Sequence, residues 1–249
     1  MQKDSIFAHP LDQLASFSFD EQVARVFPDM IKRSVPGYSQ ILGMAGVIAK
    51  RYVPEGGRIY DLGASLGAST LSVLQQLSEL GQLEVIAVDN SESMVQRCKE
   101  LLQQAHPRRE VQVVCADINH LDYQPCDLIL LNFTLQFLPL KERQPLLEKL
   151  FAALRPGGAL LLSEKVHFDD PRQSQLLYEL HHDFKRANGY SDLEISQKRT
   201  ALEDVLRTST PEAHQQALQQ AGFAFTLQWF QYLNFVSFLS IKGGTHAAA

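Results

Sequence analysis

The sequence has few cysteines, and none of them is arranged for metal binding or cross-linking. Its three cysteines, Cys98, Cys115 and Cys126, show no C-x-x-C spacing and have no paired histidines beside them. Structural zinc sites and disulfide frameworks depend on such closely spaced sets. We therefore expect free, mostly buried thiols and no metal centre.

Long apolar runs are also missing. No stretch approaches the ~20 apolar residues that a membrane-spanning helix needs. The first residues, MQKDSIFAHPLDQL, contain no apolar core of the kind that signal peptides have. The sequence thus predicts a cytoplasmic protein without membrane contact.

A surplus of positive charge is absent as well. The formal net charge is −5 and the isoelectric point is about 5.9, whereas nucleic-acid-binding proteins usually carry a basic surplus. We expect no direct contact with nucleic acid, although this net charge leaves room for a local basic patch.

What the sequence does have is a regular alternation of strand-like and helix-like segments. Hydrophobic residues make up 45% of the 249 residues, enough for one well-filled core. Continuous Val, Ile and Leu runs predict parallel strands that are covered on both faces, in an α/β fold with a doubly wound, mostly parallel sheet. The expected strands are 58–62, 84–89, 111–116, 128–133 and 159–163, and the expected helices are 70–80, 91–104 and 140–154.

We expect one domain built from four consecutive parts. Residues 1–55 form a helical preface that can cover a cofactor, and residues 56–165 form the cofactor-binding core. Residues 166–208 break the alternation with two consecutive helices, which predicts an insertion over the strand ends. Residues 209–242 supply a last helix and two aromatic-rich strands, an antiparallel pair at the sheet edge.

Local signals refine these boundaries. Pro28 is expected to interrupt the first helix. Ser39 and Ser69 are expected to cap the helices that follow them. The Arg-Pro-Gly-Gly segment at 155–158 predicts a turn before the fifth strand, residues 1–17 an arm, and GGTHAAA a disordered tail.

The stretch IYDLGASLGAST, residues 59–70, joins a buried strand to a helix through a glycine turn. Gly63 and Gly67 let the backbone approach a ligand closely. A strand, a glycine loop and a helix N-terminus form the nucleotide-binding corner of doubly wound sheets. The spacing G-x-x-x-G differs from the dinucleotide and phosphate-loop patterns. The turn therefore favours a nucleoside without a pyrophosphate, with S-adenosylmethionine (SAM) the leading candidate.

Two acids follow the next strands at places that suit the rest of a nucleoside. Asp89, followed by Asn90, stands 26 residues after Gly63, close to the ~20 of dinucleotide sites, and can accept both ribose hydroxyls. Asp117 suits the adenine amine, and Ile118 can cover the ring. Ligands of such sheets bind at the carboxyl ends of the strands. The alternatives are a helix cap for Asp89 and an ordinary loop aspartate for Asp117.

Asn132 ends the fourth strand, within the sequence LLNFTLQFL. Its neutral amide can donate and accept hydrogen bonds, so it can touch the sulfonium end of SAM without transferring a proton. A cap for the following helix fits the same pattern equally well.

A group of basic residues lies in or just before the expected insertion. They are Lys165, Lys185, Arg186, Lys198 and Arg199. Such a run usually forms a solvated helix face, and binding of a small polyanion above the cofactor is the competing interpretation. His181, His182 and Asp183 do not predict a metal site, because adjacent helical residues point about 100° apart and no third ligand has suitable spacing.

Five stretches together resemble one enzyme family. They are QVARVFPDMIKRSVPGYSQI, YDLGASLGASTLSV, VDNSESM, LNFTLQFL and HHDFKRANGYSDLEISQKR. In these stretches, and from about residue 7 to residue 242, the chain is similar to the carboxy-S-adenosylmethionine synthases. Those bacterial enzymes are related to SAM-dependent methyltransferases and contribute to wobble-uridine modification in tRNA. The glycine turn is shared with many methyltransferases, whereas SVPGY and HHDFKRANGYS are specific to the family.

The resemblance implies an activity. A carboxyl group would pass from prephenate to the methyl group of SAM, giving carboxy-SAM and phenylpyruvate. SAM would then be a substrate, and no metal would take part. The resemblance further implies a homodimer and a functional hand-off of the product to a tRNA-modifying enzyme.

The resemblance also assigns the site, position by position. It places nine residues around carboxy-SAM: Tyr38, Gly63, Ala64, Ser65, Asp89, Asn90, Asp117, Ile118 and Asn132. It makes Arg199 the catalytic partner of the new carboxylate, and a guanidinium fork suits that role because it can form two parallel hydrogen bonds. Ala64 stands where we expect cysteine in the family, a change between small residues that keeps the backbone contact.

Two other functions use many of the same residues. An ordinary SAM-dependent methyltransferase would have this glycine turn and these acids but would not need Arg199 near the methyl group. A non-catalytic SAM-binding carrier would bind the ligand without turnover. Release of phenylpyruvate from SAM and prephenate distinguishes the synthase from both.

Overall fold

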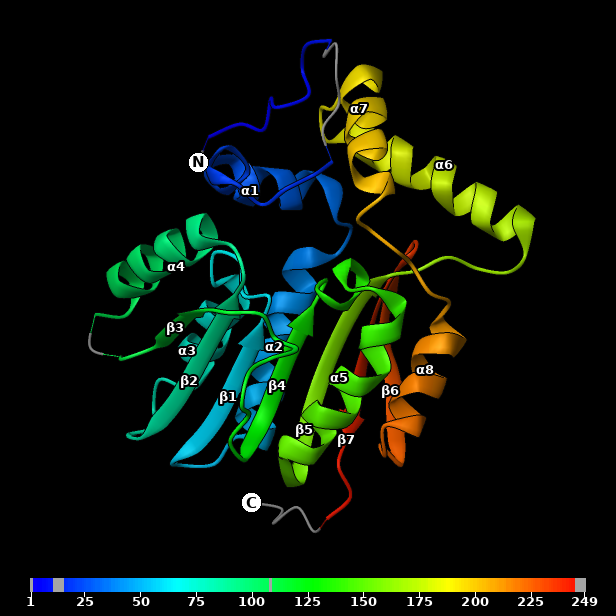
Figure 1. Cartoon of the computed structure of the whole chain (residues 1–249). Coiled ribbons are helices and arrows are strands. Elements are labelled where there is room, and N and C mark those ends of the chain that lie inside the picture. Colours follow the sequence, from blue (N-terminus) through cyan, green and yellow to red (C-terminus); the bar gives the residue numbers. More distant parts are fainter. Residues whose placement is uncertain (1, 11–15, 108, 245–249) are drawn as a thin grey trace.

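One mixed sheet runs through the centre of the molecule (Figure 1). The computed structural model describes residues 2–10, 16–107 and 109–244; most of the predicted tail and part of the predicted arm lie outside them. Within the described residues, the sheet has seven strands in the order β3-β2-β1-β4-β5-β7-β6. Strands β1 to β5 pair in parallel, and β7 runs antiparallel between β5 and β6. The predicted doubly wound, mostly parallel sheet is confirmed.

Helices alternate with the parallel strands, as the Val-, Ile- and Leu-rich runs predict. The strands are β1 (Gly57–Leu62), β2 (Leu83–Asp89), β3 (Gln112–Cys115), β4 (Cys126–Asn132) and β5 (Leu154–Lys165). The helices around them are α2 (Tyr38–Tyr52), α3 (Ala68–Gln76), α4 (Glu92–Ala105), the short 3-10 helix η1 (Leu135–Phe137) and α5 (Leu140–Ala153). Four of the five predicted strands have bounds within two residues of the observed ones, and β5 extends further at both ends.

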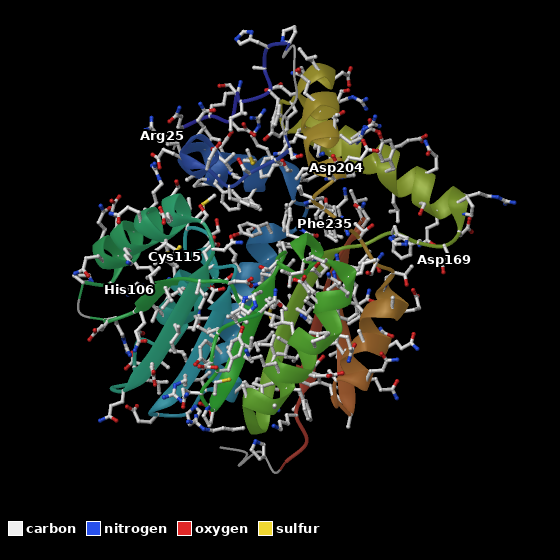
Figure 2. All side chains as sticks on the ribbon, viewed as in Figure 1. Arg25, His106, Cys115, Asp169, Asp204 and Phe235 are labelled. Carbon is white, nitrogen blue, oxygen red and sulfur yellow. The ribbon has the colours of Figure 1, made fainter. Side chains whose placement is uncertain are left out.

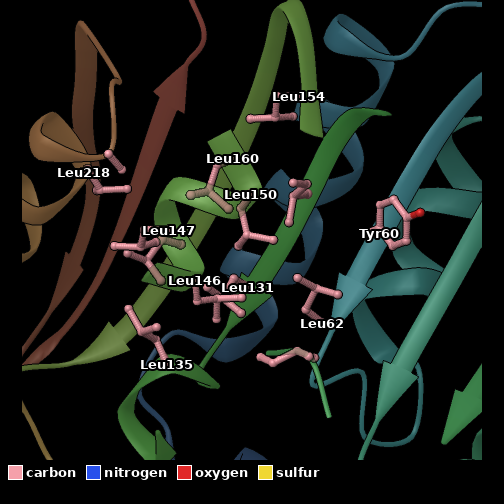
Figure 3. Packing of buried hydrophobic residues seen from close by; sticks show 14 of the residues in the cluster. Tyr60, Leu62, Leu131, Leu135, Leu146, Leu147, Leu150, Leu154, Leu160 and Leu218 are labelled. Carbon is pink, nitrogen blue, oxygen red and sulfur yellow. The ribbon is translucent and has the colours of Figure 1, made fainter. Parts of the chain in front are cut away.

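Each face of the sheet buries its own hydrophobic core. Helices α5 and α8 (Pro211–Gln220) cover the front face in Figure 1, and Figure 3 shows their leucines packed against Leu62 and Leu131. Helices α2, α3 and α4 cover the other face, against Ile59 and Leu128. Neighbouring residues of one strand point to opposite faces, so a strand buried on both faces is apolar throughout.

The chain ends in an antiparallel hairpin of β6 (Phe225–Tyr232) and β7 (Phe235–Ile241), as the sequence predicts. Strand β7 pairs with β5, which leaves β6 at the edge. Thr210 caps α8 with its side chain, and Gly222 follows the end of this helix with φ +113°.

Three helices lie above the carboxyl ends of the parallel strands (Figure 1). They are α1 (Glu21–Ser34), α6 (Pro171–Ala187) and α7 (Asp192–Glu203), and together with residues 2–10 they are called the lid below. Each helix has a side-chain N-cap, which satisfies early N–H groups: Asp20, Asp170 and Ser191, respectively. Segments that are far apart in the sequence therefore meet in the lid.

Buried Arg33 joins the parts of the lid. Its Nε donates to the carbonyl of Asn188 at 2.7 Å, and its Nη1 donates to the carbonyl of Asp4 at 3.2 Å. Its guanidinium lies 3.8 Å from the ring centroid of Tyr190, whose hydroxyl donates to Asp4. Lys198 approaches the same Asp4 carboxylate at 3.7 Å. Residues 2–10, α1 and α7 are thus tied by one buried polar network.

Three local predictions outside the glycine turn are wrong. Helix α1 continues through Pro28, because its apolar face packs on Met94 and compensates for the lost N–H donor. Ser39 does not cap α2; Gly37, with φ +74°, precedes the first turn instead. The segment 155–158 lies inside β5 as an irregularity in its pairing with β4, not before the strand.

Candidate active site

A cavity of about 340 Å³ lies between the carboxyl ends of the strands and the lid. This volume is in the range of small-molecule sites. Nine of the ten predicted site residues line it: Tyr38, Gly63, Ala64, Ser65, Asp89, Asn90, Asp117, Ile118 and Asn132. The sheet topology thus brings together residues from four strand ends, and α2 adds Tyr38.

The glycine turn after β1 is held against a loop that follows β4. Gly63 has φ +72°, and a Cβ added to it would lie 2.1 Å from Oγ1 of Thr134. Only glycine allows both this conformation and this approach. The N–H groups of Gly63 and Ala64 donate to the Val88 carbonyl at 2.8 and 2.9 Å, which fixes the turn to β2.

Ser69 does not cap α3, contrary to the prediction. Gly67, with φ +79°, takes the N-cap position without a side-chain hydrogen bond. Buried Asp61 instead accepts from the backbone N–H and the hydroxyl of Thr70, at 3.0 and 2.6 Å. Burial raises the pKa of Asp61 to about 6. Ser69 is then free to accept from Asn132, and it lines the cavity.

Asp89 bridges the glycine turn and the start of α4. Its Oδ2 accepts from the N–H of Ser65 at 2.8 Å, and its Oδ1 accepts from the N–H of Ser91 at 2.9 Å. Ser91, not Asp89, caps α4 through its hydroxyl. Burial raises the pKa of the Asp89 carboxyl. Each oxygen keeps a further lone pair, so the carboxylate can still accept hydroxyl groups.

Asp117 and Ile118 follow β3 at the next strand end. Asp117 accepts from the N–H of Asn119 at 2.9 Å and lies 3.2 Å from Nδ1 of His120. Ile118 is buried and lines the cavity beside it. A hydrogen-bond acceptor next to an apolar wall can bind a flat heterocycle with an exocyclic amine.

Asn132 is held on both sides of its amide. Its Nδ2 donates to Oγ of Ser69 at 3.0 Å, and its Oδ1 accepts from Oγ of Ser163 at 2.7 Å. The following helix η1 has Thr134 at its N-cap position, so Asn132 does not cap it. These two bonds fix the amide orientation at the end of β4.

Aromatic residues form a wall of the cavity that the sequence does not reveal as part of the site. Phe133 has φ +58°, a strained conformation for a bulky residue, and lies near Tyr38 and Phe235. Figure 2 shows Phe235 between the sheet and the lid. Phe27 of α1 and Phe19, just before this helix, also line the cavity. The sequence signal that could have placed Phe19 and Phe27 at the site is the amphipathic pattern of residues 19–27, because its apolar face has to pack against another surface.

The predicted basic group divides into two sets. Lys165, Lys185 and Lys198 line the cavity. Burial lowers the pKa of Lys185 to about 7 and that of Lys198 to about 8. Arg186 lies on the surface and pairs with Asp183 and Asp192. Three of the five basic residues therefore face the cavity, and Arg186 belongs to a solvated helix face.

His181 also lines the cavity, and its Nε2 donates to the Ser34 carbonyl at 2.8 Å. Burial lowers its pKa, so it stays neutral. Within the described residues, no group of three or more His, Cys, Asp or Glu side chains could hold a metal ion.

Arg199 is not among the residues that line the cavity of this single chain. It follows Lys198 on α7, and neighbouring helical residues point about 100° apart. Its Nη1 donates to the hydroxyl of Tyr178 at 2.6 Å near the surface. Its contact with a carboxylate stays a prediction.

Comparison with known proteins agrees with this geometry. Residues 59–158 match the methyltransferase domain family. The carboxy-S-adenosyl-L-methionine synthase of Chromohalobacter salexigens is 53% identical over 240 residues, which cover 96% of this chain and 88% of that protein. The enzyme of the same name from Photobacterium profundum is 52% identical over 240 residues, which cover 96% of this chain and 98% of that protein.

The chain belongs to the carboxy-S-adenosyl-L-methionine synthase family.

Solved structures agree on the fold of this synthase family member. Human N-acetylserotonin methyltransferase, solved with SAM, has a TM-score of 0.60 and 18% identity, covering 90% of this chain and 55% of that one. A SAM-dependent methyltransferase of Methanococcus maripaludis has a TM-score of 0.60 and 17% identity, covering 96% of this chain and 100% of that one. The synthase therefore shares the SAM-methyltransferase fold, and the fold supports the use of SAM.

We predict that Asp89→Ala weakens SAM binding by ~1.5–3 kcal/mol, because a charge-assisted hydrogen bond to ribose is lost. This corresponds to roughly ten- to a hundredfold in Kd. Calorimetry on the folded variant measures it, with exposed Asp122→Ala as the control. Unchanged affinity in the Asp89 variant would remove this residue from the site.

Proposed function

We propose that this protein carries out the reaction of its family with prephenate as the carboxyl donor and SAM as the acceptor. The products are carboxy-SAM and phenylpyruvate. The observation that carries the proposal is the polarity of the cavity, with Asp89 and Asp117 at one end and three lysines at the other. The acidic end suits adenosine, and the cationic end suits carboxylates, which a plain methyl transfer does not require.

The order of the strands supports one direction for SAM. Strands β3, β2, β1 and β4 are neighbours. Asp117, Asp89, Gly63 and Asn132 follow one another along that edge. Adenine would lie beside Asp117 and ribose beside Asp89, and the sulfonium group with its amino-acid portion would lie beside Gly63 and Asn132, with the methyl group directed toward β5.

The reaction balances between the two substrates. Prephenate loses its ring carboxylate as carbon dioxide and its ring hydroxyl as hydroxide, which leaves aromatic phenylpyruvate. The hydroxide takes one methyl proton and becomes water, and the methyl carbon bonds to carbon dioxide. The protein holds both molecules together under the lid, excludes water and supplies positive charge where carboxylate forms.

We propose Arg199 as the partner of the new carboxylate, on the basis of the family resemblance. The guanidinium has the fork geometry for two parallel hydrogen bonds. In the single chain it bonds to Tyr178 outside the cavity. The proposed contact therefore needs a rearrangement of α7 or a second copy of the chain.

The proposed product fits a role in modifying the tRNA wobble uridine to its oxyacetyl form, through hand-off to a tRNA-modifying enzyme in the cytoplasm. The acidic net charge of −5 supports a protein that does not itself bind the tRNA. Within the described residues, no helix is long and apolar enough to cross a bilayer.

An ordinary methyltransferase is the main competing function, and the methyltransferase-domain match over residues 59–158 favours it. That enzyme would consume SAM and release the demethylated nucleoside. It would not depend on prephenate.

We predict that the purified protein, given SAM and prephenate, forms phenylpyruvate and a SAM derivative heavier by one CO₂ unit in equal amounts. Absorbance of the enol at alkaline pH and mass spectrometry measure the two products. Reactions without SAM or without protein correct for spontaneous loss of carbon dioxide. SAM binding without either product would favour the carrier, and demethylated nucleoside would favour the methyltransferase.

We predict that Arg199→Ala weakens carboxy-SAM binding by ~1.5–3 kcal/mol, or roughly ten- to a hundredfold, whereas SAM binds almost as before because it lacks the second carboxylate. Arg199→Lys should be impaired less, since it keeps the charge but loses the paired bonds. Calorimetry with both ligands measures this, and exposed Arg172→Ala on α6 is the control. Equal weakening for both ligands, or full turnover in Arg199→Ala, would return Arg199 to the solvated surface.

We predict a symmetric homodimer from the family resemblance and from three exposed leucines on lid helices α6 and α7, which are Leu176, Leu180 and Leu193. Light scattering should give a mass near twice 28.0 kDa. A Leu176→Glu and Leu180→Glu double variant should shift the mass toward one chain. A monomer mass for the unchanged protein across micromolar concentrations would reject the dimer.

A further inference from the structure

Two lysines face the cavity without compensation. Lys165 ends β5, and Lys185 lies on α6, so one belongs to the sheet and the other to the lid. Lys185 is only 8% exposed. Within the described part of the chain, neither ammonium group forms an ion pair or a side-chain hydrogen bond. Burial lowers the pKa of both groups, and the nearby charges of Lys165 and Lys198 lower the pKa of Lys185 further.

Lys198 shows what compensation looks like in the same cavity. Its Nζ donates to Oγ of Ser34 at 3.1 Å and approaches Oδ2 of Asp4 at 3.7 Å. The polar network of the lid therefore accounts for Lys198, although this residue also lines the cavity. The same network does not reach Lys165 or Lys185.

Nearby titratable groups do not offset the two charges. His181, one helical turn before Lys185, is neutral and donates to the Ser34 carbonyl. Glu164 precedes Lys165, but neighbouring strand residues point to opposite faces, and its Oε1 accepts from the N–H of Leu135. Asp183 is engaged by Arg186 at the surface.

The position of the pair separates it from the adenosine end. Lys165 ends β5, which is the fifth strand in the sheet order β3-β2-β1-β4-β5. Asp117 follows β3 at the other limit of that row. A molecule bound beside Lys165 and Lys185 would thus lie next to the sulfonium end of SAM.

Lys185 is buried and Lys165 is partly buried, so two uncompensated cations are held partly out of water. Such desolvation is costly, and a ligand that carries two negative charges offsets this cost. We propose that Lys165 and Lys185 form the anion subsite of the second substrate, with one ammonium group for each carboxylate of a small dicarboxylate. The assignment rests on the proposed function, since prephenate is such a dicarboxylate. It adds the residues that recognise the donor, and it makes this ligand a bridge between sheet and lid.

The test compares Lys165→Met and Lys185→Met with Arg186→Met, which removes a surface charge next to Lys185. Methionine keeps the apolar stem, and circular dichroism with thermal unfolding checks that each variant folds. We expect each lysine variant to raise the KM for prephenate at least tenfold and to leave the Kd for SAM within twofold. Lys185→Arg should recover part of the loss, and Arg186→Met should match the unchanged protein.

Malonate serves as a probe that does not depend on turnover. In the presence of SAM, malonate should raise the thermal unfolding midpoint of the unchanged protein and of Arg186→Met. It should not raise that of a double variant that combines Lys165→Met with Lys185→Met. If malonate stabilises the protein in this way but no phenylpyruvate forms, the anion subsite is supported and the proposed function is rejected. Normal phenylpyruvate formation with unchanged KM in folded lysine variants would reject the subsite and keep the function.

A third result concerns SAM itself. If the lysine variants weaken SAM tenfold or more, the lysines hold the carboxylate of its methionine portion, and the assignment to a second substrate is overturned.

Discussion

The half of the cavity that we propose for adenosine, called the adenosine half below, depends on one close contact, between the backbone of Gly63 and the side chain of Thr134. The contact leaves no room for a Cβ at Gly63. Thr134 also donates to the Leu62 carbonyl at 2.9 Å, while the N–H groups of Gly63 and Ala64 donate to Val88. The turn is thereby fixed to β2 on one side and to the loop after β4 on the other. Three strand ends keep their relative positions because of it.

The two halves of the cavity are built by different physical means. The adenosine half uses backbone groups and short side chains at strand ends, such as Asp89 with the N–H of Ser65. Its geometry follows from the parallel sheet. The other half combines Lys165 at a strand end with Lys185 from the lid. Its geometry depends on how the lid helices pack, and its charge is retained at the expense of folding stability. A binding requirement is the physical reason for keeping such a pair.

Much of the fold could be predicted because the decisive signals are local and repeated. Apolar runs define the parallel strands, and the spacing between Gly63 and Asp89 locates the strand ends that line the cavity. The remainder depends on contacts between distant segments. Pro28 stays inside a helix because of packing that sequence pattern does not contain. Lys185 and Arg186 are neighbours in the sequence, yet one is buried and the other is paired at the surface. Only the angle between adjacent helical residues and the position of α6 separate them.

The lid network has a consequence for how the chain folds. Arg33 bonds to the carbonyl of Asn188, 155 residues later, and the hydroxyl of Tyr190 bonds to Asp4 across 186 residues. During synthesis these early polar groups remain hydrated until the later segment has left the ribosome, whereas β1, β2 and β4 can pair sooner. Contacts of such sequence separation close slowly because the entropy of a large loop must be lost first. The lid network therefore cannot form before residues 188–190 are available, and a state that has the sheet without the lid would have strand ends but no enclosed binding site.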